Sequence, residues 1–428
     1  MSRLRGLVAD TRPLENVHFR RLWLANIVTV IGAQLTVVAV PAQIYADTGS
    51  SAYVGLTGVF GLVPLIVFGL WGGALADVFD RRTILVCTTL GLIVTSALFW
   101  LQAALGNTDV WLLLILFAVQ QAFFGVNQPT RSAILPRIVP AEQLTAANAL
   151  NSTVFMAGGI AGPLVAGALI PVLGLEGLYL IDTVTLFATL SAVVRLPSMA
   201  IDAVVTRTPG LRSVIEGFGY LRGHPVLLMS FLVDLIAMIF GMPRALFPEI
   251  AHESFHGPDE GGLAFALLFA AIPAGAVLGG VFSGWVSRIR AQGKAVVWCI
   301  LVWGAAMTGF GIAVAIAAAS DRLRTTFLVV AVAMLVIGGA ADMASSAFRQ
   351  AILLTSATDE VRGRLQGIFI VVVAGGPRIA DVAHGAAAAA IGTSVAAAGG
   401  GVLVMVFTVV AAVAVPSFVR YRLTTERD

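Results

Sequence analysis

Residues 375–392 read GGPRIADVAHGAAAAAIG, and the apolar run around them extends from about 365 to 391. A helix needs roughly 20 apolar residues to cross a bilayer, so this run is long enough. It nevertheless contains Arg378, Asp381 and His384, and a charge near the bilayer centre costs about 2.5–3.5 kcal/mol on insertion scales. Side chains three residues apart share one sector of a helix surface. The stretch therefore predicts a membrane helix whose ionisable face meets protein or water.

These three side chains have two interpretations. In the first, Arg378 and Asp381 form an internally neutralised pair that is kept for packing. In the second, they serve transport, because intramembrane ionisable residues usually face a watery cavity. His384 favours the second interpretation, since it is the only one of five histidines inside an apolar segment, and histidine changes charge near neutral pH.

The composition is that of a membrane protein, because 58% of the 428 residues are hydrophobic and only 11% are charged. The pattern predicts an all-α membrane protein with twelve transmembrane helices. The widest polar interruption divides these helices into an N-terminal six-helix bundle (1–196), a cytoplasmic linker (197–224) and a C-terminal six-helix bundle (225–428). The predicted spans are about 20–46, 53–78, 83–105, 110–130, 147–172, 176–196, 225–250, 263–287, 295–318, 325–348, 364–391 and 393–416.

Basic residues lie on one side of the predicted topology. Of the 26 basic residues, 25 are arginine, and 22 lie in the termini or in alternate loops. Under the positive-inside rule that side is the cytoplasm, so we expect a multi-pass protein of a bacterial inner membrane with both termini cytoplasmic. The first 18 residues are polar and basic and lack the short apolar core of a cleavable signal peptide.

The two halves share a short sequence similarity. Residues 131–150 read RSAILPRIVPAEQLTAANAL, and residues 349–368 read RQAILLTSATDEVRGRLQGI. At a constant offset of 218 residues, five positions coincide, among them Arg131 and Arg349. Both segments follow the fourth span of their half, which indicates a six-plus-six parallel repeat. The alternative is chance similarity between sequences of shared membrane composition.

Two motifs are typical of helices that move against one another. The loop after the second span reads GGALADVFDRRTIL (72–85), in which glycine allows close helix approach and aspartate faces a helix N-terminus. The fifth span contains MAGGIAGPLVAG (156–167), whose small residues allow tight packing and whose proline bends the helix. An ordinary positive-inside loop and ordinary small-residue packing are the alternatives. The residues assigned to a gating motif are Gly73, Asp77, Arg81, Arg82, Arg131, Gly162 and Pro163.

Twelve spans in two halves, together with these two motifs, resemble the major facilitator superfamily. Val78 and Asp80 depart from its loop pattern, where a basic residue and a glycine are common. Three stretches resemble the branch that contains the bacterial enterobactin (siderophore) exporters: VAVPAQIYADTGSSAYVGL (38–56), GMPRALFPEIA (241–251) and FAAIPAGAVLGGVFSG (269–284). The resemblance implies proton-coupled efflux by alternating access.

In this superfamily, the first helix of each three-helix unit lines the cavity, which here implies spans one, four, seven and ten. Polar side chains are tolerated there because a cavity offers them hydrogen-bond partners. The residues assigned to a substrate cavity are Gln34, Gln43, Gln120, Gln121, Arg244 and Asp342. The residues assigned to proton coupling are Asp234, Arg378, Asp381 and His384, with Asp234 expected at the depth of Arg378.

Some intramembrane polar residues have other interpretations. Asp182 lies in the sixth span, a peripheral helix of the superfamily, and is interpreted as structural. Arg244 near the outer end of span seven is either a snorkelling interface residue or an anion-recognition group. Asp342 precedes Arg349 by seven residues, so the two lie two turns apart on one helix face.

The sequence contains no motif of an enzyme, such as a Walker-type phosphate loop or HExxH. His252 and His256 have the spacing of a helical metal pair, but an exposed acidic loop explains them better. We therefore expect no cofactor, no metal, no nucleic acid partner and a monomer. The predicted function is secondary active export of a small amphipathic organic molecule, siderophore or drug-like, coupled to proton influx. The alternatives are an uncoupled facilitator or importer of a metabolite and a non-transporting membrane receptor.

Overall fold

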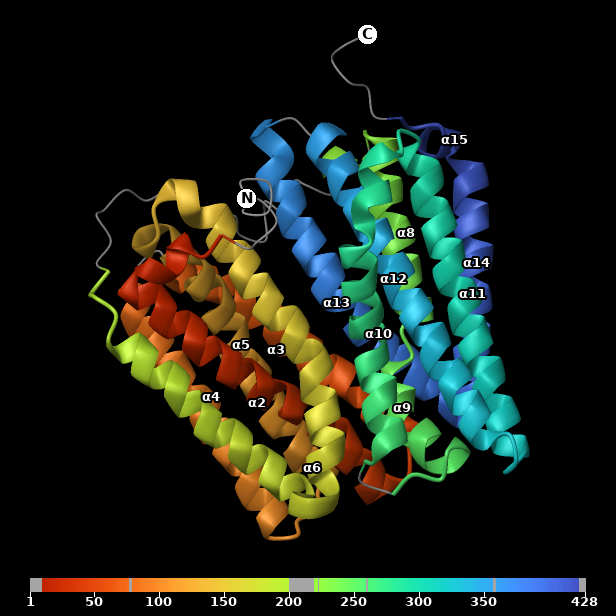
Figure 1. Ribbon diagram of the computed structural model, residues 1–428, viewed down its shortest axis with the longest axis horizontal. Helices are drawn as coiled ribbons and strands as arrows, with labels where there is room; N and C mark the ends of the chain where they lie inside the picture. The colour runs from red at the N-terminus through yellow and green to blue at the C-terminus, as the bar shows by residue number, and fades with distance from the viewer. Residues whose placement is uncertain are drawn as a thin grey trace, which may run out of the picture. The chain divides into compact units, whose positions relative to one another are not determined.

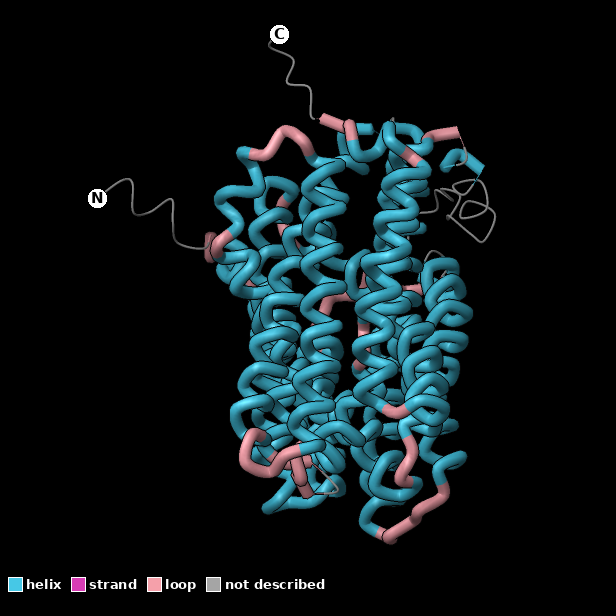
Figure 2. The backbone as a smooth tube through the Cα atoms, turned by 90° about the vertical axis from the view of Figure 1, so that its right-hand side faces the viewer, coloured by secondary structure: helices cyan, strands magenta, loops and turns pink. Residues whose placement is uncertain are grey.

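The computed structural model describes residues 10–76, 79–199, 219–221, 223–258, 261–356 and 359–422. Within these ranges every regular element is a helix, as Figure 2 shows. The predicted all-α fold is confirmed, because the apolar runs form helices that satisfy their own backbone hydrogen bonds, as a bilayer requires.

The elements are labelled in Figure 1. The first part of the chain forms η1 (Arg12–Glu15), α2 (Val17–Thr48), α3 (Ser51–Ala76), α4 (Arg81–Ala104), α5 (Val110–Ile138), η2 (Ala141–Gln143) and α6 (Leu144–Val194). The second part forms α8 (Pro225–Gly241), η3 (Arg244–Leu246), α9 (Phe247–Glu249), η4 (Ile250–Ser254), α10 (Leu263–Val281), η5 (Ser283–Arg288), α11 (Gln292–Ala319), α12 (Arg324–Ser356), α13 (Asp359–Ile391), α14 (Thr393–Ala414) and α15 (Pro416–Val419).

Ten helices within the described residues are long and apolar enough to cross a membrane. One of them is α6, whose 51 residues are interrupted by non-helical backbone at Gly174 (φ 66°), so it has the length of two spans. The 33-residue α13 is also of spanning length but is not among the ten. The exact number of twelve spans therefore stays a prediction.

The chain divides into two compact units, and the division does not follow chain order alone. Unit 1 comprises residues 1–40 and 63–208, and unit 2 comprises residues 41–62 and 209–428. The hairpin 41–62, the end of α2 and the start of α3, thus belongs to unit 2, whereas the sequence predicted one uninterrupted bundle up to residue 196.

Helix α2 passes from unit 1 to unit 2 at Pro41, and α3 returns beside Pro64. A proline inside a helix removes one backbone hydrogen bond and clashes with the preceding turn. The backbone hydrogen bonding of each helix is therefore interrupted close to the point at which the helix passes from one unit to the other.

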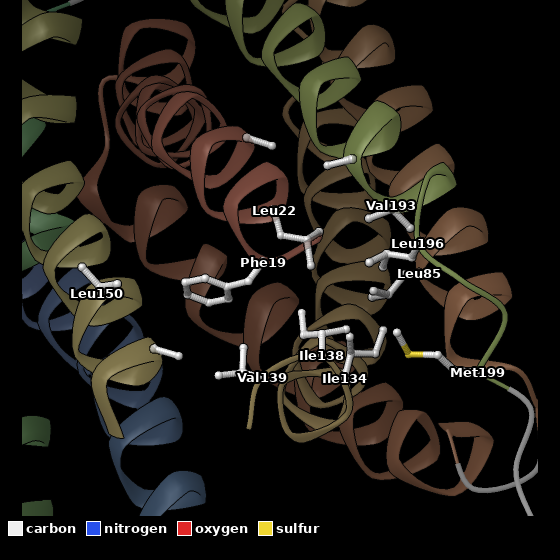
Figure 3. Packing of buried hydrophobic residues seen from close by; sticks show 13 residues of the cluster. Phe19, Leu22, Leu85, Ile134, Ile138, Val139, Leu150, Val193, Leu196 and Met199 are labelled. Carbon is white, nitrogen blue, oxygen red and sulfur yellow. The ribbon is translucent and has the colours of Figure 1, made fainter. Parts of the chain in front are cut away.

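In unit 1, one buried apolar cluster joins α2, α4, α5 and α6 (Figure 3). Phe19 and Leu22 of α2 pack with Leu85 of α4, and Met199 from the segment after α6 completes the cluster. The cluster fixes the end of α6 near the start of α4, which is where the sequence predicted a gating loop.

In unit 2, α11 lies beside both α12 and α14 (Figure 1). Glycines allow the close approach of α11 and α14. A Cβ on Gly304 would lie 2.8 Å from the Gly401 carbonyl oxygen, and a Cβ on Gly401 would lie 2.5 Å from the Gly304 carbonyl oxygen. Such contacts between small residues are how membrane helices gain packing energy without a hydrophobic driving force.

Candidate functional site

A cluster of three charges, of which Asp234 and Arg349 are buried and Asp342 is 24% exposed, connects α8 and α12 in unit 2. Arg349 of α12 forms an ion pair with Asp234 of α8, and its Nη2 lies 3.8 Å from Oδ1 of Asp342. Asp234 is 1% exposed and Arg349 is 3% exposed, so both are shielded from solvent. Two carboxylates therefore share one guanidinium inside the helix bundle.

Sequence reasoning missed the role of Arg349. The predicted tenth span ended at residue 348, which left Arg349 in a cytoplasmic loop. In the structure α12 continues to Ser356, so Arg349 is a helical residue two turns after Asp342. The two-turn spacing was visible in the sequence, but the partner on α8 was not. We expected Asp234 near Arg378, and the structure pairs it with Arg349 instead.

The three ionisable residues of α13 lie in a second cluster of unit 2. Asp381 and His384 are buried, at 8% and 4% exposure. The charges that act on Asp381 are those of Arg244 in η3 and of Arg378. The Nε2 of His384 lies 3.0 Å from the carbonyl oxygen of Phe240, and because a carbonyl only accepts, Nε2 carries the proton. The structure thus brings Arg244 to the α13 residues, a grouping that sequence reasoning did not make.

Helix α3 lies directly on the backbone of this ionisable part of α13. A Cβ on Gly58 would be 2.1 Å from the carbonyl oxygen of Arg378, and one on Gly55 would be 2.6 Å from that of Asp381. A Cβ on Gly385 of α13 would be 2.5 Å from the carbonyl oxygen of Ser51. Only glycine permits these approaches, so the hairpin 41–62 is fitted to the charged turns of α13.

Two hydrogen bonds attach the same hairpin to the segment that follows α8. The backbone N–H of Ser51 donates to Oε2 of Glu249 over 3.2 Å, and the Tyr45 hydroxyl donates to Oε1 of Glu253 over 3.3 Å. The ring of Tyr45 lies 6.0 Å from that of His252, centre to centre. His252 thus contacts an aromatic ring, and within the described residues no group of three His, Cys, Asp or Glu side chains is arranged to hold a metal ion.

The predicted cavity glutamines are divided between the units. Gln120 and Gln121 of α5 are each 9% exposed and lie in unit 1, whereas Gln43 is 6% exposed and lies in the hairpin of unit 2. Gln34 of α2 packs on Gly162, where a Cβ would be 2.2 Å from the Cβ of Gln34.

The predicted small-residue face of α6 packs against α2. Besides the contact of Gly162 with Gln34, a Cβ on Gly158 would be 2.2 Å from Cγ1 of Val30. Pro163 is buried beside this contact. The glycines therefore set a close distance between α2 and α6, which is the packing role that the sequence predicted as the alternative to gating.

The arginines of the predicted gating motif form hydrogen bonds with neighbouring helices of unit 1. Arg81 Nη1 donates to the carbonyl oxygen of Ala133 over 2.9 Å, and Arg82 Nη2 donates to that of Val194 over 2.6 Å. Arg131 Nη1 donates to Oδ1 of Asn26 over 3.1 Å. The predicted gating residue Asp77 lies outside the described residues, as do the surroundings of Gly73.

Asp80, which departs from the superfamily pattern, organises this loop. Its carboxylate caps α4 by accepting from the Arg82 backbone N–H (2.8 Å), and it accepts from Ser198 Oγ (2.6 Å) and the Met199 backbone N–H (3.3 Å). Burial disfavours the charged form, but these hydrogen bonds and the charge of Arg82 outweigh it, so the pKa of Asp80 lies below its ordinary value.

Asp80→Ala is expected to lower the free energy of unfolding by about 0.5–2 kcal/mol, the usual value of a lost N-cap. The folded state lowers the pKa, so the contribution of Asp80 is fully present above the ordinary carboxyl pKa of about 3.9. It disappears as the pH falls through the lowered folded-state pKa. Melting temperatures of the purified variant and of wild type, measured from pH 7 downwards, should therefore converge at acidic pH.

Asp109→Ala is the matched control, because Asp109 caps α5 without a contact to a second segment. Asp80→Ala should cost more stability than Asp109→Ala at pH 7. A stability difference for Asp80→Ala that is the same at every pH would contradict the ionic role of this residue.

A buried carboxylate in the described part of unit 1, Asp182, has surroundings that differ from those of the acids in unit 2. Asp182 of α6 is 2% exposed, and its Oδ2 accepts from Thr36 Oγ1 (2.7 Å) and Ser96 Oγ (3.0 Å). Among the described residues no cation pairs with it. Asp182 thus holds α2, α4 and α6 together through hydroxyl groups, in contrast to the ion pairs of unit 2.

Helices of membrane-spanning length with an ion pair buried between two of them are typical of a membrane transporter. Residues 9–425 match the family model described as transmembrane secretion effector. The chain belongs to this family of the major facilitator superfamily.

Curated relatives of the chain are exporters. Macrolide efflux protein A of Streptococcus pyogenes is 26% identical over 300 residues, which are 69% of this chain and 73% of that protein. The enterobactin exporter EntS of Shigella boydii is 24% identical over 351 residues, which are 82% of this chain and 80% of that protein. The fold is similar to that of the nucleoside transporter NupG, with a TM-score of 0.72 at 11% identity, covering 94% of this chain and 98% of that one.

Proposed function

We propose that this protein is a secondary active exporter that moves a small amphipathic organic molecule out of a bacterial cell, coupled to proton influx. The observation that carries the proposal is the Asp234–Arg349–Asp342 cluster with its buried ion pair, in a chain whose curated relatives are a macrolide efflux protein and an enterobactin exporter. The protein would lie in the inner membrane as a monomer with both termini in the cytoplasm, as the arginine distribution predicts.

The charge count of the cluster suits a proton carrier. With all three groups ionised, two carboxylates and one guanidinium have a net charge of −1. Burial makes a surplus charge costly, and a proton on one carboxylate removes it. The cluster therefore binds this proton less tightly while Arg349 contacts both acids, and more tightly when one acid loses that contact.

Helix movement would couple this proton to transport. Asp234 belongs to α8, while Arg349 and Asp342 belong to α12, so a shift of α8 against α12 separates the ion pair. A carboxylate that loses its cation becomes easier to protonate. If this shift accompanies alternating access, the protonation state of the cluster depends on the side of the membrane to which the transporter is open.

The second cluster would contribute in the same way. Burial favours the protonated form of Asp381, the charges of Arg244 and Arg378 favour its ionised form, and His384 offers a second group for the proton. Gln34, Gln43, Gln120, Gln121, Arg244 and Asp342 would line the substrate path, and the contacts of Arg81, Arg82 and Arg131 would hold the cytoplasmic ends together before opening.

Asp234→Asn is expected to abolish gradient-driven export while leaving the protein folded. Export of a radiolabelled macrolide and of enterobactin is measured from cells with and without a protonophore. Asp182→Asn is the matched control, because Asp182 is an equally buried carboxylate that makes only hydroxyl hydrogen bonds. We expect the loss in Asp234→Asn to exceed tenfold and the control to stay within about twofold of wild type.

Asp381→Asn and His384→Ala extend the test to the second cluster. Wild-type export that remains sensitive to the protonophore in Asp234→Asn, Asp381→Asn and His384→Ala would rule out these residues as proton carriers. Wild-type transport that ignores the protonophore would indicate an uncoupled facilitator.

A further inference from the structure

The predicted seventh span is a broken helix, and Arg244 lies at the break. Helix α8 ends at Gly241, and Met242 has non-helical backbone (φ −116°, ψ 85°) before the short turn η3 begins. Pro243 contributes because it has no N–H to continue the helix. Broken helices at membrane depth are tolerated where the backbone is buried in protein or lines a site, and in transporters they often form substrate sites.

The position of the break is set by packing on α11. A Cβ on Gly241 would lie 2.1 Å from Nε1 of Trp303, and that nitrogen donates to the carbonyl oxygen of Ala237 over 3.2 Å. Trp303 is 2% exposed, so a buried indole fixes the last turn of α8. The segment that carries Arg244 is therefore held in place by a rigid neighbour.

Arg244 has charged neighbours on α13, on which η3 packs. It acts electrostatically on Asp381 and on Arg378, both on α13. Within the described part of the chain, no hydrogen bond or ion pair to its guanidinium is formed. Other arginines within the helices form such contacts: Arg349 pairs with Asp234, and Arg131 donates a hydrogen bond to Asn26.

The cluster around Arg244 has a surplus positive charge. Arg244 and Arg378 contribute two positive charges, and Asp381 contributes one negative charge. The surplus negative charge of the other cluster does not offset it directly, because the cation that acts on Asp234 and Asp342 is Arg349. The half-buried guanidinium of Arg244 has no hydrogen-bonded counter-ion among the described residues, so an anion that enters here gains the energy of pairing with it.

The surroundings argue that Arg244 points into the protein. Pro243, Ala245 and Leu246 beside it are buried, and η3 packs on α13. The charges nearest to Arg244 are on α13, where Asp381 is 8% exposed. A snorkelling arginine would extend to the lipid headgroups instead.

We propose that Arg244 binds an anionic group of the exported molecule, a carboxylate or an ionised phenol, and that Arg378 adds to the positive potential at this point. The inference rests on the proposed export function and names its substrate class. A guanidinium has five N–H donors in a planar fork and binds a carboxylate through two parallel hydrogen bonds. A lysine offers one point charge without this geometry, so it replaces arginine only in part.

Matched pairs of an acid and its amide test the site without knowledge of the natural substrate. Binding of 2-naphthoate against 2-naphthamide, and of salicylate against salicylamide, is measured by thermal shift and tryptophan fluorescence on protein purified in detergent without added lipid. We expect wild type to bind each acid at least tenfold more tightly than its amide. Arg244→Gln should bring this ratio close to one, and Arg244→Lys should leave an intermediate ratio.

Arg322→Gln is the control, because Arg322 is exposed in the turn before α12 and should leave the ratio unchanged. Size-exclusion profiles check that each variant is folded, and Arg244→Lys keeps the test valid if Arg244→Gln is not. No preference for the acids in wild type, or an unchanged preference in Arg244→Gln, would overturn the proposal. A melting-temperature increase with phosphatidylglycerol that disappears in Arg244→Gln, without any acid preference, would identify a lipid anchor and overturn it as well.

The two proposals fail in different ways. If the acid preference depends on Arg244 but no gradient-driven export occurs, the anion site stands and the export function falls. If export is gradient-driven but Arg244→Gln neither changes it nor changes the acid-to-amide ratio, the exporter stands and the anion site falls.

Discussion

Arg349→Ala is expected to lower the free energy of unfolding by about 3–5 kcal/mol, the usual cost of removing one partner from a buried ion pair. The reason is that Asp234, at 1% exposure, would be left as a buried carboxylate without its cation, and Asp342 would lose the same partner. Gradient-driven export should disappear together with the stability. Thermal unfolding in detergent and export from cells measure the two effects.

Removing the acids as well separates stability from coupling. In the triple variant Arg349→Ala with Asp234→Asn and Asp342→Asn, no buried charge remains uncompensated, so much of the lost stability should return. Export should stay absent, because this cluster has no carboxylate left to take a proton. Arg322→Ala is the control for a surface arginine and should change stability by less than about 0.5 kcal/mol. Wild-type stability of Arg349→Ala would show that the ion pair is not needed, and restored export in the triple variant would remove the cluster from the coupling mechanism.

Gly58→Val should have the second largest effect, because its side chain would occupy the position of a backbone atom. The Cβ would lie 2.1 Å from the carbonyl oxygen of Arg378. This oxygen is a backbone atom, so it cannot move aside as the end of a flexible side chain can. Helix α3 must therefore move away from α13. Overpacking of this kind lowers the free energy of unfolding by about 1–3 kcal/mol. We expect export to fall more than tenfold, since the hairpin 41–62 would no longer fit the charged turns of α13.

Cysteine labelling reports the movement directly. Ser51 is 2% exposed, so Ser51→Cys should react slowly with a water-soluble maleimide in the wild-type background and rapidly when combined with Gly58→Val. Gly399→Val in α14 is the control, because a Cβ at Gly399 meets nothing within 4 Å. Slow labelling and normal export in Gly58→Val would contradict the close fit of α3 on α13.

The class of fold could be predicted because the relevant signals are local in the sequence. The length of an apolar run shows whether a helix can cross the bilayer. The arginine content of a loop indicates the side of the membrane on which the loop lies. Asp381 and His384 could be selected as candidates from the sequence, because an ionisable residue in an apolar run is unusual whatever it contacts, and the structure buries both. For the same reason Asp234 was selected from the sequence, although its partner was not.

The partners of these charges were decided by tertiary structure alone. Whether Arg349 lies in a loop or in a helix depends on where α12 ends, and span ends are set by packing and not by hydropathy. Asp234 meets Arg349 because α8 packs beside α12, and Arg244 meets Asp381 because η3 packs on α13.

The sequence by itself determined that this chain is an all-α membrane transporter of its superfamily and that a few intramembrane charges distinguish it. The tertiary structure decided which charges compensate one another, that Arg244 forms no hydrogen bond among the described residues, and that the hairpin 41–62 joins the second unit. The physical reason is that the free energy of membrane insertion depends on each helix separately, whereas ion pairing and glycine contacts depend on the distance between two helices.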